Sequence, residues 1–359
     1  MTIAKTLARL ALAGAVTALA LGATPSFAET LRLLTWGGYA PDALVAKFKQ
    51  ETGIDVEVTL SNNEEMIAKL RATGGSGFDL VQPSQDRITG AQQEFDIYKP
   101  IDLSKIDESA YIPSMLEATK KNTTLDGKVY GVPLVWGTDG LVLDTTKAPD
   151  VKDYTDLCNP AYAGKVSYRL KRPTLIAFSF AMGMDPFAAY GDQAKYKEIM
   201  DKVEQKLVDC KPNVKTYWSG GDEILNLMRS GEVVAAMAWD TGGWKLNADN
   251  PDITFIAPKS GALGWIDTFA LPRNGKADDA AYKWINFVMK PENAAMVTAA
   301  AGNFTSSKGS DALVDPALKE RYQKSFPQEA IDNIKWYPPV PAGLETIEGG
   351  VLDRVNAAQ

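Results

Sequence analysis

The sequence predicts an α/β protein, and two observations carry that prediction. Short apolar strands alternate with helical segments in the order βαβαβ near the start of the chain, which predicts a parallel sheet with helices on its faces. The length of 359 residues allows about two domains of roughly 100–200 residues each. With 45% hydrophobic and 23% charged residues, the composition is that of an ordinary globular protein.

The first of these strands covers residues 31–35, and Pro41 suits the first turn of the helix that follows. Apolar residues alternate with polar ones over 54–60, which predicts a half-buried strand. A second helix ends near Gly74, and a third strand covers 78–81. Ligands of such sheets bind outside the carboxyl ends of the strands. The side chains that follow the strand ends are therefore candidates for a binding site: Trp36, Tyr39 and Ser84.

The middle of the chain predicts a passage into a second lobe. Residues 132–143 are mostly extended and are interrupted by Gly137 and Gly140. A second α/β run follows, with a strand at 166–168 and a buried helix at 178–184. The later elements are helices at 222–228, 280–289 and 292–301, strands at 233–239, 253–256 and 264–271, and a helical C-terminal part broken at Pro338-Pro339.

Composition excludes several classes of function. The chain has no histidine and two cysteines, which removes Ser-His-Asp catalysis, Cys-His catalysis and the usual zinc sites. A net charge of −7 argues against a nucleic-acid partner, which would require a basic surface. No glycine-rich nucleotide motif and no GxSxG motif is found. We therefore expect no metal, no cofactor and no enzymatic activity.

The first 28 residues indicate export. Lys5 and Arg9 precede an apolar run over 10–22, and Ser26-Phe27-Ala28 fits a signal peptidase site. The run is too short to span a bilayer, which needs about 20 residues. A buried N-terminal helix is the alternative. We expect a mature, soluble chain that begins at Glu29 and carries no lipid anchor.

Export also permits a disulfide between the two cysteines, Cys158 and Cys210. We expect this bond; two free buried thiols are the alternative.

Aromatic residues beside acids form the most distinctive chemical pattern. Trp239-Asp240 ends a buried strand, and Trp265 lies two residues before Asp267 in another. An ammonium group is attracted to ring faces and hydrogen-bonds to carboxylates. Together with Trp36 and Tyr39, these residues predict a cage for an amine; the alternative is that the rings are ordinary core residues.

Ordered motifs over nearly the whole mature chain resemble the periplasmic spermidine/putrescine-binding proteins, which are solute receptors of ABC importers. The motifs are Leu34-Thr35-Trp36-Gly37-Gly38-Tyr39-Ala40-Pro41, Phe78-Asp79-Leu80-Val81-Gln82-Pro83-Ser84, Tyr130-Gly131-Val132-Pro133, Gly264-Trp265-Ile266-Asp267-Thr268-Phe269-Ala270-Leu271-Pro272 and Trp284-Ile285-Asn286-Phe287.

The resemblance implies a type II periplasmic binding protein fold, with two α/β lobes, each a mixed sheet flanked by helices, and the ligand in the cleft. We expect residues 29–137 with 268–310 in one lobe, and 138–267 with 311–359 in the other. It implies a periplasmic location, a membrane permease as partner and a monomeric chain. It also implies ligand contacts at Trp36, Tyr39, Ser84, Trp239, Trp265 and Asp267, with the aspartate holding an amino group.

Two departures concern the far end of the ligand. Asp86 stands where the family has a second aromatic residue, and residues 168–174 carry Arg169, Lys171 and Arg172 where the family has an acidic cluster. A guanidinium there would bind a carboxylate, so we hypothesise an ω-amino acid such as 4-aminobutyrate, with putrescine or spermidine as the alternative. We favour Arg169, add Asp86 and Asp240 to the candidate contacts, and keep a solvated basic loop as the alternative for the run. A secreted hydrolase that uses two carboxylates is a hypothesis of another class.

Overall fold

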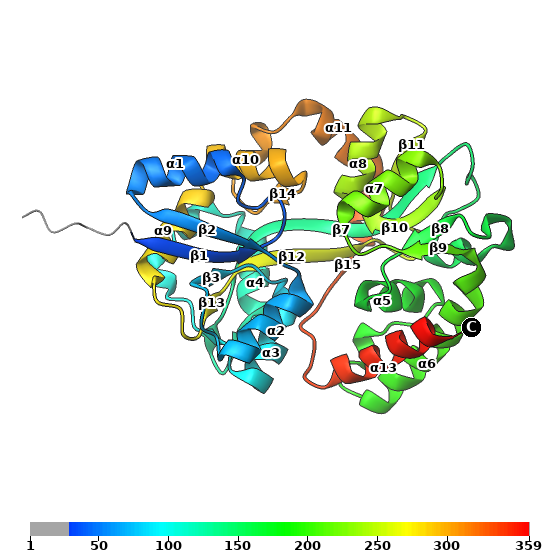
Figure 1. Cartoon of the computed structure of the whole chain (residues 1–359), viewed down its shortest axis with the longest axis horizontal. Coiled ribbons are helices and arrows are strands. Elements are labelled where there is room, and N and C mark those ends of the chain that lie inside the picture. Colours follow the sequence, from blue (N-terminus) through cyan, green and yellow to red (C-terminus); the bar gives the residue numbers. More distant parts are fainter. Residues whose placement is uncertain (1–28, 359) are drawn as a thin grey trace, which may run out of the picture.

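The computed structural model describes residues 29–358, and Figure 1 shows them as two lobes joined by long strands. The first lobe contains a parallel sheet in the order β2-β1-β3, with β1 (Thr30–Thr35) between β2 (Asp55–Leu60) and β3 (Leu80–Val81). Helices α1 (Asp42–Thr52) and α2 (Asn63–Thr73) connect these strands. The predicted βαβαβ order is therefore present.

The rest of the first lobe comes from two segments, residues 88–129 and 271–305, which precede and follow most of the second lobe in the sequence. Its elements are α3 (Ile88–Phe95), β4 (Tyr98–Lys99), α4 (Pro113–Asn122), β5 (Thr124–Leu125), β6 (Lys128–Val129), β13 (Leu271–Pro272), α9 (Asp278–Val288), α10 (Pro291–Ala301) and β14 (Phe304–Thr305). Phe48 packs edge-on to the fully buried Trp284, with ring centroids 5.0 Å apart. This contact fastens α1 to α9, so the later segment completes the core that the first helices begin.

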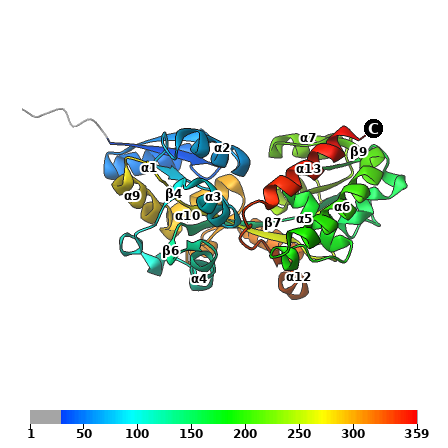
Figure 2. The ribbon, with the colours of Figure 1, turned by 90° about the horizontal axis from the view of Figure 1, so that it is seen from below.

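One strand serves both lobes. β7 (Val132–Asp144) is 13 residues long, and β12 (Leu263–Phe269) runs antiparallel to its first half. The second half of β7 pairs with β10 (Ala235–Trp239) and β11 (Ile253–Ile256). Figure 2 shows the helices of the two lobes on either side of β7. A ligand held on these strands would therefore lie between the lobes.

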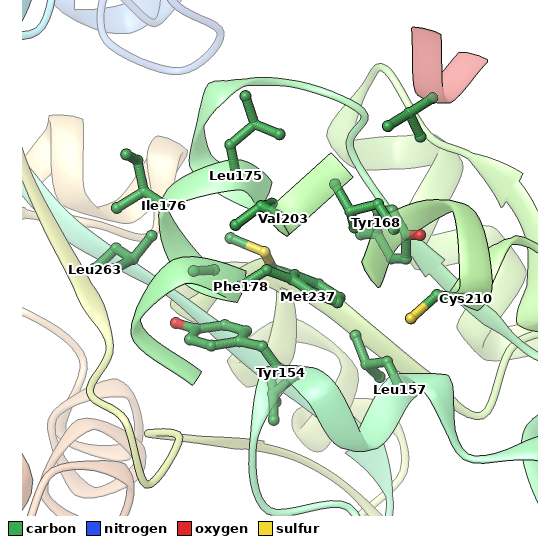
Figure 3. Packing of buried hydrophobic residues seen from close by; sticks show 14 of the residues in the cluster. Tyr154, Leu157, Tyr168, Leu175, Ile176, Phe178, Val203, Cys210, Met237 and Leu263 are labelled. Atoms are coloured by element: carbon green, nitrogen blue, oxygen red, sulfur yellow. The ribbon is translucent and has the colours of Figure 1, made fainter. Parts of the chain in front are cut away.

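The second lobe contains the rest of the mixed sheet, which runs β15-β12-β7-β10-β8-β9. Its elements are β8 (Val166–Tyr168), α5 (Arg172–Ala181), α6 (Gln193–Cys210), β9 (Val214–Tyr217), α7 (Gly221–Ser230), α8 (Asp240–Asp249), α11 (Pro316–Ser325), α12 (Gln328–Asp332), β15 (Lys335–Trp336) and α13 (Leu344–Ala357). Figure 3 shows part of its core, in which Tyr168 and Met237 of the sheet lie close to Phe178 of α5 and Val203 of α6. At the edge of this core Cys210 is bonded to Cys158, as predicted, with Cα atoms 4.6 Å apart.

Between β15 and α13, both in the second lobe, residues 337–343 run along the boundary between the lobes (Figure 1). Tyr337 N–H donates to the carbonyl of Gly264 at 3.0 Å, and Val340 N–H donates to the carbonyl of Asp86 at 2.9 Å. α13 then packs on α6. This segment therefore touches the first lobe before its helix closes the second.

Two expectations need correction. The strand over 54–60 is not half-buried along its length, because β2 lies at the sheet edge and leaves Val58 39% and Leu60 63% exposed. The extended segment over 132–143 is not interrupted by its glycines. A Cβ at Gly137 would lie 2.5 Å from Cζ2 of Trp265, and one at Gly140 would meet the Phe255 ring. These glycines therefore give two aromatic rings room to lie against the strand.

The predicted signal peptide, 1–28, lies outside the described residues. Between residues 29 and 358, no helix has the length and apolarity needed to cross a membrane.

Candidate ligand-binding site

A cavity of about 550 Å³ lies between the lobes and receives side chains from both. Its volume is within the range of sites for small molecules. Eight of the nine predicted contacts line it: Trp36, Tyr39, Ser84, Asp86, Arg169, Trp239, Trp265 and Asp267. The ninth, Asp240, does not.

Asp267 of β12 forms one end of the cavity and is prearranged by two hydroxyl groups. Tyr39 Oη donates to Oδ2 at 2.6 Å, and Ser84 Oγ donates to Oδ1 at 2.5 Å. Asn63 Nδ2 in turn donates to Ser84 Oγ at 2.9 Å, so the serine proton is directed to the aspartate. Tyr39 follows β1, and Ser84 follows β3 and forms an isolated bridge with Asp267. The ends of two parallel strands thus meet the crossing strand at this point.

The Asp267 carboxyl is 3% exposed. Burial raises its pKa to about 7, against the opposing effect of the hydrogen bonds from Ser84 and Tyr39. A cation beside it would offset the cost of burying the charge, because an opposite charge nearby favours the ionised form. This end of the cavity is therefore chemically suited to an ammonium group.

Indole rings form the wall and floor next to Asp267. Trp265 lies opposite Gly137 in the β7–β12 pair, and its ring occupies the space that a side chain at 137 would fill. Trp36 Nε1 donates to the carbonyl of Gln82 at 2.8 Å, which fixes that ring after β1. Both rings are half-buried and line the cavity.

The other end of the cavity contains Trp239 and Arg169. The Arg169 guanidinium lies 5.2 Å from the ring centroid of Trp239 and 5.4 Å from that of Trp218. These distances are within the range of cation–π contacts. The sequence predicted that Trp239 and Asp267 surround the same ammonium group; the structure instead places Trp239 beside Arg169. β10 pairs with the second half of β7, so Trp239 lies opposite Asp139 and beside Arg169.

The basic run has three different environments. β8 ends at Tyr168 and α5 begins at Arg172, so Arg169 and Lys171 lie in the turn before the helix; all three basic residues line the cavity. Lys171 is exposed. Arg172 is buried and forms ion pairs with Asp86 (3.2 Å) and Glu348 (3.1 Å) and a hydrogen bond with Tyr190. A loop whose charges all face solvent does not describe this segment.

Two of the predicted acids are engaged with protein groups. Burial raises the pKa of Asp86, while the nearby guanidinium of Arg172 acts to lower it. Asp240 begins α8 outside the cavity lining and accepts hydrogen bonds from Thr138, Thr241 and Asn303. Burial raises its pKa to about 7. Its role is to join α8 to β7 and to Asn303.

Sequence reasoning missed several functional candidates. Asp139 lines the cavity, and the only signal for it was an acid within the apolar extended run over 132–143. Tyr337 also lines the cavity, and its buried hydroxyl has no partner among residues 29–358. Asn63 lines the cavity and hydrogen-bonds to Ser84, and Glu348 supports the site from behind through Arg172. Their roles depend on contacts between distant segments, for which no local pattern exists.

Comparison with known proteins identifies the family. Residues 43–324 match the family model described as bacterial extracellular solute-binding protein. The spermidine/putrescine-binding periplasmic protein of Escherichia coli (strain K12) is 30% identical over 339 residues, covering 92% of this chain and 94% of that one. The chain belongs to this solute-binding protein family.

Solved structures of solute-binding proteins share the fold. The spermidine/putrescine ABC transporter substrate-binding protein PotD from Streptococcus pneumoniae has a TM-score of 0.72 at 23% identity, covering 92% of this chain and 99% of that one. The Atu4243 GABA receptor has a TM-score of 0.69 at 20% identity, covering 92% of this chain and 97% of that one. The two-lobe α/β fold predicted from the sequence is therefore the fold of this family. As a member, the chain is a solute-binding protein of the ABC importer type.

Proposed function

We propose that this solute-binding protein is a periplasmic receptor that delivers a small ω-amino acid, of the 4-aminobutyrate or 5-aminovalerate type, to the permease of an ABC importer. The observation that carries the proposal is the pair of opposite charges in one cavity. Asp267 lies at one end, and Arg169 lies at the other with no carboxylate within 4.0 Å of its guanidinium among residues 29–358. We propose further that the protein acts as a monomer and that hinge closure around the ligand is its working motion.

The Asp267 end favours an ammonium group for two reasons. Each of its oxygens already accepts one hydroxyl hydrogen bond, and a carboxylate retains further acceptor positions. The faces of Trp36 and Trp265 add cation–π attraction of roughly 0.5–2 kcal/mol each. Three donors of an ammonium group can thus find acceptors here without any rearrangement of the wall.

The Arg169 end favours a carboxylate. Its guanidinium lies against two indole rings that pack on each other, so less conformational freedom remains to be lost on binding, and Nε is buried without a partner among the described residues. A planar guanidinium can bind a carboxylate through two parallel hydrogen bonds. The Atu4243 GABA receptor has the same fold, which supports only the statement that this fold is compatible with such a ligand.

A polyamine is the second candidate, and the name of the Escherichia coli relative favours it. A second ammonium held near Arg169 would meet like charge, and a partly desolvated cavity increases that cost. For this reason we expect putrescine and spermidine to bind more weakly than the ω-amino acids.

A carboxylate-dependent hydrolase requires two acids facing each other roughly 5–9.5 Å apart across the scissile bond. Asp267 and Asp139 instead lie on one face of the crossing strands, with their backbones about 13 Å apart along the strands at roughly 3.3 Å per residue. Two acids on the same wall, rather than on opposite walls of the cavity, favour a binding role over catalysis.

The test is a competition between putrescine and 4-aminobutyrate, two ligands that differ at one end. Titration calorimetry with each should give binding of 4-aminobutyrate and weaker binding of putrescine, with no product formed on prolonged incubation. Tight putrescine binding without detectable 4-aminobutyrate binding would assign the protein to the polyamine receptors. Turnover of either ligand would contradict the receptor role.

A further inference from the structure

Asp139 is a buried carboxylate that the proposed ω-amino acid leaves unused. It is 5% exposed, lines the cavity, and its side-chain oxygens accept no hydrogen bond from any of residues 29–358. Buried carboxylates are normally hydrogen-bonded or paired with a cation. Asp267, Asp240 and Asp86 all have such partners, whereas Asp139 has none within residues 29–358. This contrast indicates that the partner of Asp139 is a group that enters the cavity.

The pairing of the strands places Asp139 relative to Asp267. On β7 and β12, Asp267 lies opposite Val135, Trp265 opposite Gly137 and Leu263 opposite Asp139. Residues that pair across an antiparallel ladder, and those two positions apart on one strand, share one face. The two carboxylates therefore stand on the same face, on either side of the Trp265 ring.

Asp139 also shares its end of the cavity with Arg169. Trp239, whose ring contacts the Arg169 guanidinium, lies opposite Asp139 in the β7–β10 pair. Burial raises the pKa of Asp139 to about 7, and Arg169 is the strongest influence in the opposite direction. The two groups are near each other, yet they lie outside ion-pair distance. An acceptor and a donor thus stand side by side without satisfying each other.

We propose that the site takes an α,ω-diamino acid of the ornithine or lysine type, which rests on the proposed receptor function and names its ligand class. The ω-ammonium binds Asp267, the α-ammonium binds Asp139 and the α-carboxylate binds Arg169. The carboxylates of Asp267 and Asp139 and the guanidinium of Arg169 then meet two ammonium groups and one carboxylate in the ligand. With 5-aminovalerate Asp139 would have no ammonium partner, and with putrescine Arg169 would have no carboxylate partner.

The dimensions agree with this class. The register places the backbones of Asp139 and Asp267 about 13 Å apart along the strands. The two side chains and two N–H···O contacts of about 2.9 Å leave a shorter gap between the ligand nitrogens. The nitrogens are five bonds apart in ornithine and six in lysine, or roughly 6–8 Å in an extended chain with bonds of about 1.5 Å. The long chain of spermidine would exceed this length.

The decisive experiment uses ornithine, 5-aminovalerate and putrescine, because the last two are ornithine without its α-amino group and without its carboxylate. Calorimetry on the full chain should give ornithine the highest affinity, by about tenfold or more over each of the others, since each missing group removes one charge-assisted contact. The variants Asp139→Asn and Arg169→Met are measured alongside, with melting temperature as the check on folding.

In Asp139→Asn, ornithine affinity should fall about ten- to hundredfold, while 5-aminovalerate affinity should stay unchanged or rise. In Arg169→Met, ornithine and 5-aminovalerate should weaken and putrescine should not. If 5-aminovalerate equals ornithine and Asp139→Asn changes neither, the diamino-acid inference fails while the ω-amino-acid function stands. If putrescine binds best and Arg169→Met leaves all three affinities unchanged, both fail.

Discussion

The Asp86 carboxylate of the first lobe and the Arg172 guanidinium of the second form a buried ion pair, with Oδ2 and Nη1 3.2 Å apart. Arg172 also reaches Glu348 of α13 at 3.1 Å, so one guanidinium connects three segments of the chain. A second contact runs parallel to it, between Arg87 and Glu345 at 2.9 Å. Both contacts hold the lobes in the arrangement that encloses the cavity.

The two glutamates of α13 provide a matched test of these ion pairs. Glu348 is buried, and removing one partner of a buried pair costs roughly 3–5 kcal/mol. Glu345 is 45% exposed, so solvent screens its pair with the buried Arg87 and can replace the carboxylate when it is removed. We therefore expect Glu348→Gln to lower the free energy of unfolding much more than Glu345→Gln, as measured by urea denaturation. Equal losses in the two variants would show that Arg172 does not depend on Glu348.

Asp267 should contribute most of the affinity for the ligand's ω-ammonium. Asp267→Asn keeps the shape of the side chain and removes its charge, so 5-aminovalerate affinity should fall by roughly 1.5–3 kcal/mol, or about ten- to hundredfold. The matched control is Asp222→Asn, which removes an exposed carboxylate from the cavity rim. Calorimetry should find the control close to wild type; a similar loss in both would mean that only the overall negative charge matters.

Binding should strengthen as the pH rises toward neutrality. In the empty cavity burial raises the pKa of Asp267 to about 7, and of Asp139 to about 7. An ammonium group binds the ionised form of Asp267, so below that pKa each pH unit should cost up to about tenfold in affinity per proton displaced. Calorimetry of 5-aminovalerate at pH 5.5 and 7.5, in buffers of different ionisation enthalpy, should detect proton release at the lower pH.

The raised pKa values of these groups also determine how the stability of the unliganded protein changes with pH. Between the unfolded pKa of roughly 3.9 and the folded value of about 7, the folded chain holds more protons than the unfolded chain. The contribution of Asp267 to the free energy of unfolding is therefore lost as the pH rises through this window. Asp267→Asn should flatten that part of the pH profile, with Asp139 and Asp86 still titrating. An unchanged profile would refute the assignment.

The disulfide should be a large part of the stability of the second lobe. It joins residues 52 positions apart, and closing a loop of that length stabilises a protein by about 4 kcal/mol in the chain-entropy model. We expect urea denaturation with and without reductant to differ by an amount of this order. Labelling of the denatured, unreduced protein should find no free thiol, and two labelled thiols would contradict the bond.

Local patterns predicted the elements well but did not fix their contacts. Alternation and caps identified β1, α1, α2 and the long β7, because these signals depend on neighbours in the sequence. The lobe boundaries stay a prediction, since β7 and β12 belong to both lobes. The resemblance supplied Asp267 and its neighbours. It could not supply Asp139, whose importance comes from pairing with β10 and β12 and from a lack of partners that only the folded chain reveals.

The same limit explains the errors at the far end of the site. Trp239 and Arg169 are 70 positions apart in the sequence, and their contact arises because β8 and β10 are neighbours in the sheet. Asp240 follows a cavity residue directly, yet the turn into α8 directs its carboxylate to Thr138 and Asn303. Neighbours in the sequence therefore did not predict which side chains line the cavity, because that depends on which strands are neighbours in the sheet.

The missing side chain at Gly137 limits how this receptor could diverge. Any larger residue would collide with the Trp265 indole and with the Asn303 amide, so substitutions there would disturb the floor under every ligand alike. The side walls have no such restriction, because in the proposed complex Asp139 and Arg169 each contact one functional group of the solute. New solute preferences could therefore arise through single replacements at these two positions, while the floor and the Asp267 end are inherited unaltered.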